Sequence, residues 1–60
     1  MKIIVDSMGS DKGPQEIIKG AVDGINELGV EIVLVGEENI IKKELSKYTY
    51  PKNSIEIINA

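Results

Sequence analysis

Cysteine, histidine and arginine are all absent from this 60-residue sequence. Without cysteine or histidine, the chain offers neither a disulfide nor a Cys/His zinc site. Without arginine, no guanidinium clamp on a phosphate or a carboxylate can come from these residues. The lack of cysteine also fits a reducing cytoplasm. A domain of this size buries only about 60% of the surface of its unfolded chain, so its stability is expected to be marginal.

A basic surface and a long apolar segment are missing as well. The net charge is −3, from ten acidic and seven basic residues, whereas proteins that bind nucleic acid usually present a basic face. No apolar run approaches the roughly 20 residues needed to cross a bilayer. Asp6 interrupts the apolar start before it is long enough for a signal peptide. We therefore expect a cytoplasmic protein with no nucleic-acid partner.

Three short apolar runs predict strands. The consecutive β-branched residues Ile3, Ile4 and Val5 predict a short buried strand over residues 2–6. Residues 31–35 predict a second strand that is apolar on both faces. Residues 55–58 predict a third strand, which follows the turn marked by Pro51 and Asn53.

Two helices are predicted between these strands, because the apolar residues there recur at helical spacing. Pro14 fits the first position of the first helix, and Gly29 fits the position just after its end. Glu37 and Glu38 begin the second helix, where carboxylates meet the positive end of the helix dipole. The expected inner stripes are Ile17, Ile18, Ala21, Val22, Ile25 and Leu28 in the first helix, and Ile40, Ile41, Leu45 and Tyr48 in the second.

The resulting β-α-β-α-β order predicts an α/β fold with parallel strands, the beginning of a doubly wound sheet. A strand order of 3-2-1 places both helices on one face and leaves the other bare, whereas 2-1-3 places one helix on each face. Parallel strands that are apolar on both faces need cover on both, and neither order provides it. We therefore interpret residues 1–60 as the N-terminal segment of a longer α/β enzyme, or as a chain that needs a partner, and expect it not to fold stably alone.

The connection VDSMGSDKGP, residues 5–14, is the candidate functional segment. It lies between a strand and a helix, where ligands of parallel sheets bind and where free backbone N–H groups attract anions. Glycine lets the backbone turn sharply or approach a ligand closely. The segment lacks both the dinucleotide fingerprint G-x-G-x-x-G and the P-loop ending G-K-[ST]. The predicted phosphate- or substrate-binding residues are Gly9, Ser10, Asp11, Lys12 and Gly13.

The side chains of this connection leave several roles open. Asp6 and Asp11 are the candidates for a catalytic role, but a carboxylate at a strand end also binds loop amides, and Asp11 also fits an Asx-turn or a helix cap. Both would repel a phosphate unless Lys12, a metal or backbone donors offset them. Ser7 and Ser10 have no histidine to act as their base and are interpreted as loop hydrogen-bonding residues. We predict neither a bound metal nor a cofactor.

The chain resembles the start of the phosphate acyltransferase family of bacterial phospholipid synthesis. Members typically begin with V-D-A-M-G-G-D-x-A/G-P and continue with E-x-I/V-x-G-A and L-V-G-D/E, and the resemblance covers the whole chain. Ser7 stands where alanine is usual, Ser10 where a second glycine is usual and Asn59 where histidine is frequent. The matching residues are Asp6, Met8, Gly9, Asp11, Pro14, Glu16, Gly20, Ala21, Leu34, Val35 and Gly36.

This resemblance implies an enzyme several times longer, with a three-layer fold akin to the isocitrate and isopropylmalate dehydrogenases. It implies a cytoplasmic homodimer, peripherally associated with the membrane, that moves an acyl group from acyl carrier protein to inorganic phosphate. The acyl phosphate would then serve a glycerol-3-phosphate acyltransferase at the membrane. Two alternatives stay open from the residues alone. One is another phosphate- or nucleotide-binding α/β protein, and the other is a truncated, non-catalytic interaction module that binds a partner through its bare sheet face.

Overall fold

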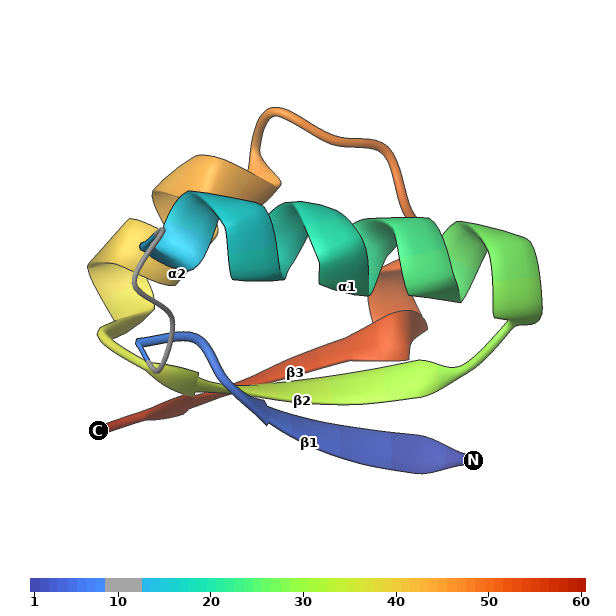
Figure 1. Ribbon diagram of the computed structural model, residues 1–60, viewed down its shortest axis with the longest axis horizontal. Coiled ribbons are helices and arrows are strands. Elements are labelled where there is room, and N and C mark those ends of the chain that lie inside the picture. Colours follow the sequence, from blue (N-terminus) through green and yellow to red (C-terminus); the bar gives the residue numbers. More distant parts are fainter. Residues whose placement is uncertain (9–12) are drawn as a thin grey trace.

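The computed structural model describes residues 1–8 and 13–60, and its elements follow the predicted β-α-β-α-β order (Figure 1). A short 3₁₀ turn, η1, precedes the last strand. The elements are β1 (Lys2–Asp6), α1 (Pro14–Leu28), β2 (Glu31–Gly36), α2 (Glu38–Leu45), η1 (Lys52–Ser54) and β3 (Ile55–Asn59). The prediction of an α/β fold is therefore confirmed.

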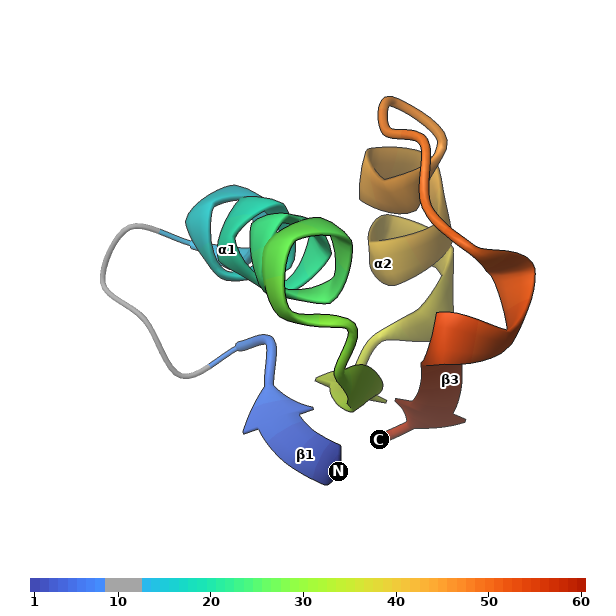
Figure 2. The ribbon, with the colours of Figure 1, turned by 90° about the vertical axis from the view of Figure 1, so that its right-hand side faces the viewer.

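The three strands form one parallel sheet in the order β1-β2-β3. The central strand, β2, aligns Ile32 with Ile3 on one side and with Ile55 on the other. Both helices lie on the same face of this sheet (Figure 2). Of the two strand orders left open by the sequence, 3-2-1 is therefore right and 2-1-3 is wrong.

The hydrophobic core lies between the helix pair and the sheet. Leu34, in the middle of β2, and Ile18 and Ile41, one from each helix, are completely buried. Side chains alternate between the faces of a strand, so Ile32 and Leu34 share the helix-facing side. The buried core residues are Ile18, Ala21, Val22, Ile25, Ile32, Leu34, Ile41 and Leu45.

Three of the predicted inner-stripe residues lie outside this core, and the first of them, Ile17, is half-buried. Leu28 is 77% exposed and Ile40 is 37% exposed. At 100° per residue, Leu28 lies about 70° from the centre of the stripe that the buried residues of α1 define. Ile40 likewise lies to one side of the buried stripe of α2, which is formed by Ile41, Glu44 and Leu45. α2 ends at Leu45, so Tyr48 packs against the margin of the core from beyond the helix.

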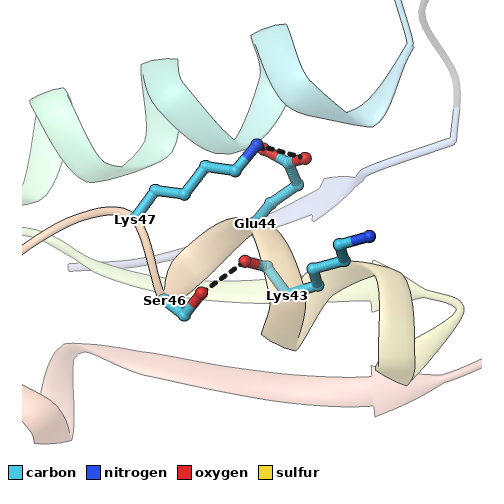
Figure 3. Close-up of polar contacts among 4 residues, drawn as sticks. All are labelled: Lys43, Glu44, Ser46 and Lys47. Atoms are coloured by element: carbon cyan, nitrogen blue, oxygen red, sulfur yellow. Dashed lines mark hydrogen bonds and ion pairs between the residues drawn. The ribbon is translucent and has the colours of Figure 1, made fainter.

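The carboxylate of the buried Glu44 is paired with the Lys47 ammonium just beyond the end of α2 (Figure 3). Its two carboxylate oxygens accept hydrogen bonds from the Lys47 ammonium at 3.0 and 3.1 Å. Burying a carboxylate costs free energy unless it is paired, so this contact lets Glu44 occupy a core-facing position. In the same turn, the Ser46 hydroxyl donates to the Lys43 carbonyl oxygen at 2.6 Å, which helps to end α2.

The opposite face of the sheet has no cover from the described residues. Ile4 is 72% exposed there and Ile58 is 46% exposed, so the prediction that β1 is buried does not hold within this chain. Val33, on the same face, is only 4% exposed, since it belongs to the central strand and lies in register between Ile4 and Glu56. We call this surface, made by Ile4, Val33, Val35 and Ile58, the open sheet face. Neither described helix has the length and apolar character to span a membrane.

Candidate functional site

The carboxyl ends of all three strands meet at one edge of the sheet, together with the starts of α1 and α2 (Figure 1). Gly13 stands at the beginning of α1, and Gly36 and Asn59 end β2 and β3. In a parallel sheet this is the edge at which ligands bind. Four of the predicted binding residues, Gly9, Ser10, Asp11 and Lys12, lie outside the described residues.

Asp6 shapes the start of the connection that follows β1. One of its carboxylate oxygens, Oδ1, accepts a hydrogen bond from the backbone N–H of Met8 at 2.9 Å. This contact, two residues along the chain, is an Asx-type turn. The sequence leaves two roles open for Asp6, catalysis and the binding of loop amides. The hydrogen bond from Met8 is of the second kind. Asp11, the other acidic candidate, lies outside the described residues.

Gly13 begins α1 in a conformation that suits glycine alone. Its φ is 86° and its ψ is 175°, a region that is essentially closed to residues with a Cβ. Having no side chain, it cannot cap the helix. Helix geometry leaves the first backbone N–H groups, here those of Gln15 and Glu16, without acceptors inside the helix. Such a helix start can bind an anion, which would share it with the exposed carboxylate of Glu16.

The start of α2 is less suited to an anion. The backbone N–H of Glu38 donates to the Asn59 side-chain oxygen at 2.9 Å, so β3 already caps this helix. Glu37 and Glu38 add two carboxylates, and Glu38 also pairs with Lys42 at 2.8 Å. Of the two helix starts at this edge, α1 is therefore the better candidate for phosphate.

Ser7 is a hydrogen-bonding residue, as predicted, but neither its partner nor its burial is indicated by the neighbouring residues in the sequence. It is completely buried, and both its backbone N–H and its hydroxyl donate to the Val35 carbonyl oxygen, at 2.9 and 3.0 Å. The hydroxyl fills the space beside Gly36, where a Cβ would overlap it. The one sequence signal for this packing is the glycine itself, since glycine within a strand often marks a close approach of two backbones.

The described part of the carboxyl edge forms an open surface and not a complete pocket. Residues 1–8 and 13–60 enclose no cavity. Within those same ranges, no three acidic side chains come together as a metal site would need. What the edge does offer an anionic substrate is backbone amides, at the start of α1.

Comparison with known proteins gives one consistent result. A family model described as "Fatty acid synthesis protein" matches residues 1–60. The chain is 49% identical over 61 residues to a phosphate acyltransferase of Fusobacterium nucleatum subsp. nucleatum and 43% identical over 61 residues to one of Halothermothrix orenii, covering 100% of the chain in each case. It is 53% identical over 58 residues to a phosphate acyltransferase of Carboxydothermus hydrogenoformans, covering 97% of the chain. The matched regions span only 18% of each of these relatives.

Proposed function

The chain belongs to the fatty acid synthesis protein family, and from that membership we propose that it is the N-terminal segment of an enzyme that transfers an acyl group from acyl carrier protein to inorganic phosphate. The relatives at 43–53% identity are named phosphate acyltransferases. Their names supply the acyltransferase class and the acceptor. The acyl donor is the further step, and it is supported by the family's place in fatty acid synthesis.

The proposed reaction is a thioester phosphorolysis. An oxygen of hydrogen phosphate attacks the carbonyl carbon of the acyl thioester, the carbon–sulfur bond breaks, and the thiol leaves with the phosphate's proton. The products are acyl phosphate and free acyl carrier protein. A substantial share of inorganic phosphate is dianionic near neutral pH, and the dianion needs little activation by a base. The protein's task is to position the phosphate and to stabilise the charge that develops.

The structural observation that supports a phosphate site in this segment is the start of α1. Gly13 opens the helix with no side chain of its own, at the carboxyl edge of a parallel sheet. We propose that the backbone amides at the start of α1 bind the phosphate and that residues 9–12 line the same phosphate site. Asp6 would act by shaping the connection through Met8. Since the chain has a net charge of −3 and no arginine, the cations that balance the phosphate and the surface that binds acyl carrier protein would lie elsewhere in the full-length enzyme.

The remaining features of the family resemblance are part of the same proposal. They are a three-layer fold akin to the isocitrate and isopropylmalate dehydrogenases, a cytoplasmic homodimer, and peripheral attachment to the membrane beside a glycerol-3-phosphate acyltransferase. The open sheet face supports the three-layer fold, because an apolar face of a parallel sheet needs a second layer of helices.

Phosphate-dependent release of thiol tests the proposed activity. Full-length protein incubated with acyl-acyl carrier protein and inorganic phosphate is expected to release free thiol in step with acyl phosphate, and replacing phosphate with sulfate is expected to stop the release. Thiol titration follows the free thiol, and incorporation of labelled phosphate into acyl phosphate follows the second product. Release at the same rate without phosphate would show a thioesterase, and no release in any condition would reject the acyltransferase.

The open sheet face also supports a second candidate, a non-catalytic module that binds a partner through it. Ile4 and Ile58 are exposed there beside the buried Val33, which is a suitable centre for an interface. Under this alternative, full-length protein would release no thiol with phosphate, and replacing Ile4 with a charged residue would abolish binding of the partner. The acyltransferase proposal expects turnover in the same thiol assay, so the assay decides between the two.

A further inference from the structure

Gly36 is the point at which three segments of the carboxyl edge come into contact. A Cβ placed on it would overlap the Ser7 hydroxyl and would lie 3.3 Å from both the Ile41 Cδ1 and the Met8 Cγ atoms. Its carbonyl oxygen accepts the Ala60 N–H at 3.0 Å, from just beyond β3. The close packing of the end of β2 with the segment after β1 and with α2 therefore depends on the absence of a side chain at residue 36.

Ser7 is fixed to this point by two hydrogen bonds. Its backbone N–H and its hydroxyl share the Val35 carbonyl oxygen as acceptor, and no part of the residue is exposed. One residue further on, the Met8 N–H is held by the Asp6 carboxylate at 2.9 Å. The backbone thus leaves β1 along a defined course, toward the connection that leads to α1.

We propose that Ser7 and Gly36 act as a matched pair of positioning residues for the phosphate site at the start of α1. This inference rests on the proposed function. Neither residue needs to touch the substrate. Gly36 leaves the space that Ser7 fills, and the buried Ser7 fixes where residues 7 and 8 leave the end of β1. A side chain at residue 36 would lift Ser7 off β2 and shift residues 7 and 8 relative to the start of α1.

The test compares Gly36→Ala with Gly24→Ala in the full-length enzyme, with both substrates varied. A misplacement near 1 Å can cost about a hundredfold in rate, so kcat/KM for phosphate is expected to fall by about ten- to a hundredfold in Gly36→Ala. KM for the acyl thioester is expected to stay within about twofold, because only the phosphate side moves. Gly24 lies in α1, where a Cβ would meet no atom within 4 Å apart from its chain neighbours and the nearby helix backbone, and its alanine variant serves as the matched control.

A second substitution distinguishes positioning from simple loss of structure. Ser7→Ala removes the hydroxyl that the new Cβ would meet, and the atoms nearest to it would then be the flexible Ile41 and Met8 side chains at 3.3 Å. The double variant Ser7→Ala/Gly36→Ala is therefore expected to recover most of the lost kcat/KM for phosphate. Recovery stays incomplete, because the φ of 158° at Gly36 lies at the edge of the glycine region. Ser7→Ala alone completes the cycle that measures the coupling.

The possible results distinguish a failure of the proposed function from a failure of the role assigned to Ser7 and Gly36. Wild-type enzyme with no phosphate-dependent thiol release rejects the proposed function, and this inference with it. An active wild type with unchanged phosphate kinetics in Gly36→Ala overturns the inference alone. So does an equal loss toward both substrates, or a double variant no better than Gly36→Ala. If Gly36→Ala fails to fold, the double variant decides: a folded protein with restored phosphate kinetics supports the pair, and a failure to fold contradicts it.

Discussion

Replacing Gly13 with alanine in the full-length protein is expected to raise KM for phosphate by about ten- to a hundredfold. Gly13 has φ 86° and ψ 175°, a region in which a residue with a Cβ costs about 1–3 kcal/mol. The Gln15 side-chain oxygen, 2.8 Å from a built Cβ, is flexible and can move away. Backbone strain is therefore the larger effect, and relieving it turns the first amides of α1 away from the carboxyl edge.

Gly29 provides the matched control for this experiment. It ends α1 with φ 69°, so Gly29→Ala places a similar strain, about 1–2 kcal/mol, at the opposite end of the same helix. Both variants are expected to lower the free energy of unfolding, but Gly29→Ala should leave KM for phosphate within about twofold of wild type. Equal effects of the two variants on KM, or none from Gly13→Ala, would remove α1 from the phosphate site.

Residues 1–60 on their own are expected to show no cooperative thermal unfolding. The two helices cover one face of the sheet and leave Ile4 and Ile58 exposed on the other. With only about 60% of the chain's surface buried at this size, the core formed around Leu34 does not offset the lost conformational entropy. Circular dichroism on a sample shown by sedimentation to be monomeric measures this, with the full-length protein as the control. A sigmoidal transition in the monomeric 60-residue sample would contradict the expectation.

The order of the elements is predictable because its signals are local. Pro14 and Gly29 bracket α1, and the β-branched runs mark the strands. The end of α2 is not predictable in this way, since no glycine or proline marks it. The helix stops at Leu45 because the next turn tightens, with the Lys47 and Tyr48 N–H groups donating to the carbonyl oxygens three residues earlier. The strand order also needs tertiary information, because both orders satisfy the same local patterns.

The sequence predicts where the candidate site lies in the fold, but it does not predict the side-chain contacts that shape it. The rule for parallel sheets places the connection after β1 at the carboxyl edge, and Gly13 lies there at the start of α1. The burial of Ser7 depends on Gly36, which is far along the chain, so no local pattern indicates it. The exposure of Leu28 follows from its angle on the helix, which a list of apolar residues does not convey. The predicted roles of residues 9–12 stay predictions.

The position of a bound phosphate tests the central claim most directly. A crystal structure of the full-length enzyme soaked with inorganic phosphate is expected to show the anion against the start of α1, accepting hydrogen bonds from backbone N–H groups in the first turn after Gly13. The acyl thioester would then approach from the open side of the carboxyl edge. An anion bound elsewhere, with the start of α1 covered by another part of the protein, would contradict the account.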